Sequence, residues 1–200
     1  MGAETDPDAA LMLRVKRGDR DAFTALVEKY KQPVMNLIYR TLPDPTEAED
    51  LAQSVFVQVY KSAARYQAAA RFSTWLFTIA RNLCLNEIRR RTRHPASPLD
   101  HGPASDCAES GRQIPDPRQA DPGDLLLRGE LTRTVEEAVR SLPDNQRLAI
   151  LLCRQEDLSY EDIARVLGCS LAATKSLIHR GRATLKHRLK PYLQSGDWTS

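Results

Sequence analysis

The sequence predicts an all-α protein made of two small helical domains joined by a flexible linker. Apolar residues recur at three- and four-residue spacing on both sides of the middle of the chain, which is typical of helices. No segment shows the strict apolar and polar alternation of a half-buried strand. We place the domains at residues 10–93 and 126–193, with the linker at 94–125.

The linker stands out by its composition. Six of the twelve prolines lie between His94 and Asp124, and no periodic apolar face can be drawn through this segment. Residues 94–127 carry a net charge of −4, whereas residues 1–93 carry +4 and residues 128–200 carry +3. Such a segment is expected to be irregular and mobile.

The first domain is expected to hold several helices in sequence. A turn at Gly18 and Asp19 separates the first two. Thr46 and Glu49 have the spacing of a capping box, which predicts the start of a helix that runs past Tyr60. Ser73 is expected to cap a long helix that ends in a basic cluster, Arg89, Arg90, Arg91 and Arg93.

The second domain contains the strongest local signal, a helix-turn-helix. Ser159 and Asp162 predict a capping box, Gly168 predicts the turn, and Ser170 is expected to cap the next helix. The segment Leu171–Lys190 contains six Lys or Arg, two His and no acidic residue. A helix of this charge gains phosphate and base contacts in the major groove of DNA. The alternative is a solvated helical face.

Composition excludes several other classes of protein. There is no paired-carboxylate pattern, Gly-rich phosphate loop or nucleophile motif, so no catalytic residue, cofactor or metal is predicted. The longest apolar run, Leu148–Cys153, is too short to span a membrane, and no secretory signal is visible. The four cysteines form no CxxC pair, which favours a reduced, cytoplasmic protein.

Four stretches together resemble one family. They are RGDRDAFTALVEKY at 17–30, EAEDLAQSVFVQVYK at 47–61, RFSTWLFTIARNLCLNEIRRR at 71–91, and the helix-turn-helix segment that begins with LPDNQRLAILL at 142. In this order, around such a linker, the chain resembles a bacterial sigma factor of the extracytoplasmic function type in the sigma-70 family.

The resemblance implies a function without catalysis. Such a protein binds core RNA polymerase at the clamp helices of the largest subunit and at the flap. It then directs the enzyme to promoters and promotes DNA melting. The first domain would read and melt the −10 element and the second would read the −35 element. The family also implies an anti-sigma factor as partner. The acidic linker would lie in a basic polymerase channel or act only as a solvated tether.

The resemblance assigns polymerase contacts to the helix that follows Thr46. Asp50 and Gln53 match the residues that contact the clamp helices. Ser54 departs from the acidic residue usual in the family, which weakens one expected contact, and Tyr60 completes the set.

The expected −10 contacts lie in the loop before the melting helix and along that helix. Asn82 matches the residue that holds a flipped base, and the variable loop from Tyr66 to Arg71 would choose the base. Tyr66 would stack on that base or lie on the surface as an ordinary tyrosine, and Trp75 would act as a wedge or belong to the core. The expected set is Tyr66, Arg71, Trp75, Arg81, Asn82, Arg89 and Arg90.

The expected −35 contacts lie on one face of the second helix of the helix-turn-helix. Lys or Arg can reach guanine edges there, whereas Arg182 is expected at a phosphate. Leu177 departs from a basic residue usual in the family. The expected set is Ala172, Ala173, Lys175, Ser176, His179, Arg180 and Arg182.

A second hypothesis is a two-domain helix-turn-helix regulator that acts without polymerase. It would explain the second domain. It would not explain the Arg-ended helix or the linker, and it would normally bind a palindrome as a dimer.

Overall fold

The computed structural model describes residues 6–42, 44–93 and 122–195, and in this part of the chain it contains eight α-helices, one short 3-10 helix and no strand. The predicted all-α class is therefore confirmed. Most of the predicted linker, residues 94–121, lies outside the described residues. Its last residues, from Pro122 onward, are already helical, so helix α5 begins before the boundary expected from the sequence.

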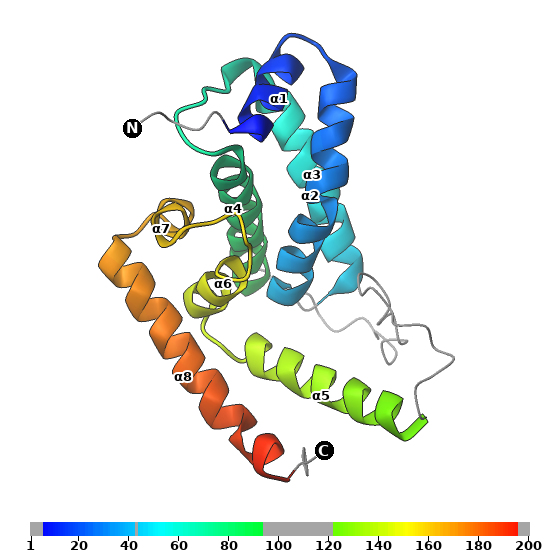
Figure 1. Ribbon diagram of the computed structural model, residues 1–200, viewed down its shortest axis with the longest axis vertical. Coiled ribbons are helices and arrows are strands. Elements are labelled where there is room, and N and C mark those ends of the chain that lie inside the picture. The colour runs from blue at the N-terminus through cyan, green and yellow to red at the C-terminus, as the bar shows by residue number, and fades with distance from the viewer. Residues whose placement is uncertain (1–5, 43, 94–121, 196–200) are drawn as a thin grey trace.

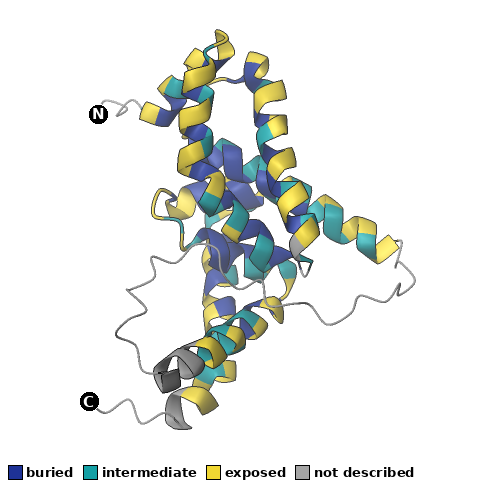
Figure 2. Ribbon diagram, turned by 90° about the vertical axis from the view of Figure 1, so that its right-hand side faces the viewer, coloured by how far each residue is buried: buried dark blue, intermediate teal, exposed yellow. Residues whose placement is uncertain are grey.

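The first four helices form one bundle, shown in the upper part of Figure 1. Its core contains apolar side chains from every helix, among them Met12, Leu37, Val55 and Phe77. Figure 2 shows these buried stretches as the dark blue inner faces of the helices. The elements are α1 (Pro7–Lys16), α2 (Arg20–Thr41), α3 (Pro45–Ser62), the 3-10 helix η1 (Ala63–Arg65) and α4 (Phe72–Arg93).

The second domain follows with four more helices. Helices α6, α7 and α8 pack on one another, and α5 packs against α8. Leu148 and Leu152 of α6 and Ile163 of α7 are fully buried in this core. The elements are α5 (Pro122–Arg140), α6 (Asp144–Leu152), α7 (Tyr160–Leu167) and α8 (Leu171–Ser195).

Two predicted helix starts are wrong. The expected box of Thr46 and Glu49 does not form; instead Asp44 caps α3, and its carboxylate accepts from the Thr46 and Glu47 N–H groups at 2.9 and 3.2 Å. Asp followed by proline at the first helical position is a stronger start than the predicted one. Ser73 does not cap α4, because the helix already begins at Phe72 and Ser73 is buried in its first turn.

The two domains lie in direct contact. Helix α7 packs on α4, and α6 packs on the end of α2, as Figure 1 shows. Arg147 of α6 joins them at one end, since its Nη1 donates to the Thr41 carbonyl oxygen at 2.8 Å. The helix-turn-helix therefore rests against the first domain in this structure.

Candidate nucleic-acid and polymerase interfaces

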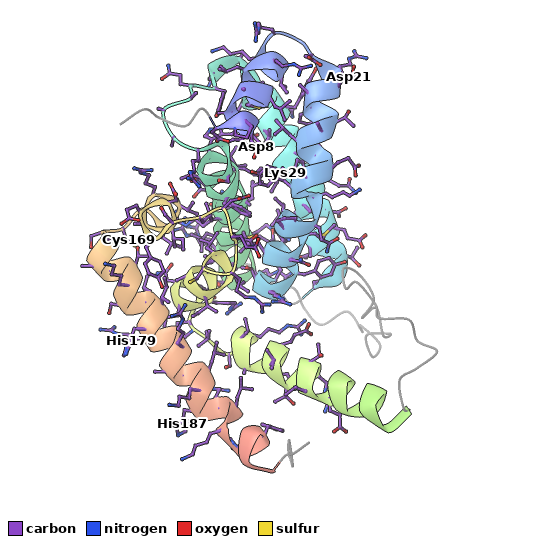
Figure 3. The ribbon with its side chains drawn as sticks, in the orientation of Figure 1. Asp8, Asp21, Lys29, Cys169, His179 and His187 are labelled. Atoms are coloured by element: carbon purple, nitrogen blue, oxygen red, sulfur yellow. The ribbon has the colours of Figure 1, made fainter. Side chains whose placement is uncertain are left out.

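Helix α8 carries one long exposed face. On its inner side Thr174 and Ile178 are buried, at 0% and 3% exposure. Figure 3 shows His179 on the outer side of the helix, away from α6. All seven residues predicted to contact the −35 element are exposed on α8: Ala172, Ala173, Lys175, Ser176, His179, Arg180 and Arg182.

The turn before α8 forms as the sequence predicted. Ser159 and Asp162 make a reciprocal capping box at the start of α7. Gly168 has a φ of 65°, the left-handed conformation that ends α7 and that other residues adopt at a cost. Ser170 then caps α8, its hydroxyl oxygen accepting from the Ala173 N–H at 3.2 Å. These local features set the direction of α8 relative to α7.

Two further contacts set the position of α8 on α6. Gly181 is buried, and a Cβ atom there would lie 2.7 Å from Cγ1 of Ile150. Only glycine allows this approach without a shift of the neighbour. One residue later, Arg182 Nη2 donates to the Cys153 sulfur at 3.3 Å. The close packing at Gly181 was not predicted from the sequence. The signal that could have indicated it is a glycine inside an otherwise continuous helical segment.

The loop before α4 is held by an aromatic cluster. Tyr66 is only 2% exposed, and its ring packs edge-on against Trp75 with centroids 4.9 Å apart. Phe72 lies beside both rings. Burial raises the pKa of Tyr66 to about 12, with Asp6 and Asp8 adding to the effect. In this arrangement Tyr66 is not free to stack on a base, and Trp75 is half-buried beside it.

Helix α7 covers part of the α4 face that was predicted to contact the −10 element. Arg81 Nη2 donates to the Leu167 carbonyl oxygen at 3.1 Å, and Arg71 Nη1 donates to the Asp157 carbonyl oxygen at 3.1 Å. Between them the buried hydroxyl of Thr74 donates to Asp162 Oδ1 at 3.0 Å. The predicted contacts Arg71 and Arg81 are therefore engaged by the second domain.

Asp162 consequently has two roles, one in the α7 cap and one between the domains. Burial acts to raise its pKa, but hydrogen bonds from Ser159 and Thr74 outweigh this and lower the pKa below the ordinary 3.8. The carboxylate is thus held charged. The sequence predicted the capping box of Ser159 and Asp162. It did not predict the contact between Asp162 and Thr74, because these two residues are 88 positions apart in the chain.

The C-terminal part of α4 is open and basic. Arg89, Arg90, Arg93 and Asn86 line a pocket of about 330 Å³. Arg90 forms a two-pronged ion pair with Glu87, at 2.9 and 2.8 Å, which raises the Arg90 pKa. Within the described residues, the side chain of Arg89 makes no hydrogen bond or ion pair. Of the predicted −10 contacts, Arg71, Asn82, Arg89 and Arg90 are exposed.

The outer face of α3 contains the predicted polymerase contacts. Asp50, Gln53, Ser54 and Tyr60 are all exposed there. Beside them lies an apolar groove of about 340 Å³, lined by Phe23, Phe56, Val57, Tyr60 and Lys61. Val57 and Tyr60 are 50% and 51% exposed, and together with Phe23 and Phe56 they make the groove an exposed apolar patch, which is more informative than a single exposed apolar side chain. The sequence analysis missed Val57 and the groove.

Other kinds of site are not visible in the described ranges. No cluster of three or more His, Cys, Asp or Glu side chains suitable for a metal occurs among them. None of the helices described is both long and apolar enough to cross a membrane. Cys84 is buried, and this raises its thiol pKa to about 12, far from the range of a reactive thiolate.

Both domains match known family profiles. Residues 26–94 match sigma-70 region 2, and residues 132–185 match sigma-70 region 4. The chain is 34% identical to the RNA polymerase sigma-H factor of Pseudomonas aeruginosa, covering 94% of this chain and 97% of that protein. It is 35% identical to the ECF RNA polymerase sigma factor SigW of Bacillus subtilis, covering 88% and 94% respectively.

Solved structures show the same fold. CnrH, in complex with the cytosolic domain of CnrY, superposes with a TM-score of 0.68 at 24% identity, covering 93% of this chain and 99% of that one. RpoE of Bartonella quintana, in complex with the anti-sigma factor NepR, gives a TM-score of 0.63 at 24% identity, over 84% and 96% of the chains. From its relatives and its two regional matches, the chain belongs to the sigma-70 family of RNA polymerase sigma factors, in the extracytoplasmic function (ECF) group.

Proposed function

We propose that this sigma factor binds core RNA polymerase through α3, reads the −35 element with α8, and reads and melts the −10 element with α4 and the loop before it. It would do so in the cytoplasm and without catalysis of its own. The observation that carries the proposal is that the predicted polymerase face on α3 and the predicted −35 face on α8 are both exposed and share no residue. One chain can therefore hold the enzyme and the promoter together.

The groove beside α3 extends the proposed polymerase surface. Tyr60 belongs both to the predicted contacts and to the lining of the groove. Apolar side chains bordered by polar ones are typical of the centre of a protein interface. We therefore assign Val57 and the groove to the polymerase, with Asp50 and Gln53 supplying polar contacts at its edge.

Simultaneous binding of both promoter elements requires the two domains to separate. Elements about 17 base pairs apart are ~60 Å apart along B-form DNA. The segment between Arg93 and Pro122 can span roughly 90 Å when extended, which is sufficient. Separation would also release Arg71 and Arg81 from α7 and so make them available to the −10 strand.

An anti-sigma factor is a further proposed partner. A solved structure with this fold is a complex of the sigma factor RpoE with the anti-sigma factor NepR, and another holds CnrH with the cytosolic domain of CnrY. An anti-sigma factor should compete with core polymerase for the chain.

The test is run-off transcription with purified core polymerase and a pool of genomic promoter fragments. Wild-type protein should produce transcripts that are absent with core polymerase alone, and their start sites would reveal both elements. Asp50→Arg should abolish them, because it reverses a charge on the proposed polymerase face. Duplex DNA binding by the isolated chain should be unchanged in that variant.

A different outcome would contradict the proposal. If core polymerase with this chain produces no transcripts while the chain alone shifts specific palindromic DNA, the chain acts as a helix-turn-helix regulator without polymerase. The α3 face would then need another explanation.

A further inference from the structure

The loop between η1 and α4 is anchored at both ends to helix α1. At its start, Lys16 Nζ donates to the Tyr66 carbonyl oxygen at 3.0 Å. At its end, the Phe72 N–H donates to Asp6 Oδ2 at 2.7 Å. Lys16 is the last residue of α1 and Asp6 is its N-cap, so the two ends of one short helix hold the two ends of one short loop.

Asp6 caps two helices at once. Its Oδ1 accepts from the Asp8 N–H at 3.0 Å and caps α1, while its Oδ2 caps α4 from a distant part of the chain. The residue before α4 is Arg71, whose side chain cannot accept a hydrogen bond. A carboxylate at this helix start satisfies a free N–H group and complements the helix dipole. The cap that Ser73 was expected to provide is thus supplied by Asp6.

Helix α1 is itself firmly held, so it can serve as a fixed support. Met12 and Val15 are buried at 0% and 4% exposure. Asp8 is buried and accepts from the Tyr30 hydroxyl at 2.6 Å and from Lys29 Nζ at 2.5 Å. Figure 3 shows Asp8 and Lys29 side by side between α1 and α2. The Tyr30 ring in turn lies edge-on against Phe72, with centroids 5.4 Å apart.

Among the described residues the loop has one further side-chain contact, from Arg71 Nη1 to the Asp157 carbonyl oxygen of the second domain. Residues 67–69 are exposed, and the Tyr66 hydroxyl is buried without a hydrogen-bond partner among the described residues. Within the first domain, the conformation of the loop therefore depends on the aromatic cluster beneath it and on the two anchors from α1. The sigma-70 region 2 match begins at residue 26, so α1 lies outside that match.

We propose that α1 fixes the geometry of the −10 recognition loop, with Asp6 and Lys16 as positioning residues that act through the loop rather than on DNA. The inference rests on the proposed function, in which this loop selects a base of the −10 element. Removing either anchor should reduce the selectivity for one base of the −10 element, because an extruded base is discriminated by a pocket of defined shape.

The test compares promoter variants that differ at single −10 positions, in transcription with full-length protein and core polymerase. Asp6→Ala and Lys16→Met should each lower the preference for the best −10 base about three- to ten-fold. Asp6→Asn should lower it less than Asp6→Ala does, because the single amide oxygen can accept from only one of the two N–H groups that the carboxylate caps. Asp44→Ala removes the cap of α3, away from the loop, and is the matched control; its preference should equal that of the wild type.

Two further measurements separate a positioning role from loss of folding or of function. Core polymerase binding and −35 duplex binding should stay within two-fold of wild type in all variants. The amide of Phe72 should exchange with solvent faster in Asp6→Ala than in the wild type, because its hydrogen bond to Asp6 is lost. If Asp6→Ala does not fold, Lys16→Met decides, since it leaves both caps intact.

The outcomes are distinct from those of the proposed function. If the wild type supports no promoter-dependent transcription, the proposed function itself fails. If the wild type transcribes and both anchor variants keep the full −10 preference, α1 does not position the loop and this inference is overturned.

Discussion

The two proposed DNA-binding faces differ in how accessible they are to DNA in the free chain. The α8 face is fully exposed, and α7 and α6 fix its position through Gly168, Gly181 and Arg182. The α4 face is exposed at Asn82 and toward its C-terminal end. On its other side α7 covers it, through Arg81 and Thr74. In the proposed function, the −35 face is therefore preformed in the free chain, whereas the −10 face becomes complete only when the domains separate.

This difference suggests an order of events on the promoter. Duplex DNA at the −35 element can be bound by the chain as it stands. Single-stranded DNA at the −10 element requires the loss of several hydrogen bonds between the domains, each worth about 0.5–1.5 kcal/mol. Polymerase binding that holds the domains apart would remove this cost.

The first prediction concerns the close packing of α8 on α6. Gly181→Val places a branched side chain where Cγ1 of Ile150 already lies 2.7 Å from a Cβ position. We expect about 1–3 kcal/mol lower stability from overpacking and a more than ten-fold loss of −35 duplex affinity. Chemical denaturation and fluorescence anisotropy would measure these.

Adding Ile150→Ala to Gly181→Val should restore much of the affinity, because it returns space to the same contact. Unchanged affinity in Gly181→Val alone would show that the α6–α8 packing does not set the −35 face.

The second prediction concerns one exposed side chain of that face. Arg180→Ala should weaken binding to the preferred −35 duplex by about 1–3 kcal/mol, roughly 5- to 150-fold, if the guanidinium reads a guanine. Lys186→Ala is the control, since it lies on the same helix outside the predicted set. Its effect should be equal on specific and non-specific duplexes. If Arg180→Ala also weakens binding equally to specific and non-specific duplexes, Arg180 contacts a phosphate and not a base.

The third prediction concerns the contact between the domains. Thr74→Val keeps the shape of the side chain but removes the hydrogen bond to Asp162, and should weaken domain packing by about 0.5–1.5 kcal/mol. Binding of a single-stranded −10 oligonucleotide to the isolated chain should then improve up to about ten-fold.

Thr78→Val is the matched control, because the Thr78 hydroxyl donates only within α4, to the Thr74 carbonyl oxygen. Binding that stays equal in both variants would mean that α7 does not restrict the −10 face.

The fourth prediction concerns acid. The lowered pKa of Asp162 means that its charged form stabilises the folded chain. This contribution is fully present above pH 3.8, the ordinary value, and is lost as the pH falls through the lower folded value. Acid titration followed by circular dichroism should show a smaller loss of stability in Thr74→Val than in wild type, because one of the stabilising hydrogen bonds is already absent. An identical acid profile would argue against this coupling.

The sequence predicted those structural features that depend on residues close together in the chain. The capping box of Ser159 and Asp162 and the turn at Gly168 involve residues within ten positions of each other, and all form as expected. The exposed −35 set follows from the helical period of α8.

Contacts between distant parts of the chain were not predictable in this way. Asp6 caps α4 across 66 positions, and Thr74 meets Asp162 across 88. Ser73 has a local capping signal, but the distant Asp6 provides the cap of α4. The error at Thr46 is of another kind, because the cap that forms there, Asp44, lies only two residues away. Tyr66 could not be placed from the sequence either, because its burial depends on Phe72 and Trp75 packing around it.

The most direct test of a preformed −35 face and a covered −10 face is the distance between the domains. Dyes placed at the exposed residues Glu28 and Glu137 would report it by single-molecule energy transfer, in the free chain and in the promoter complex with polymerase. We expect one short distance between the dyes in the free chain and a clearly longer distance in the complex. A free chain that already shows the long distance, or an active complex that keeps the short one, would contradict this expectation.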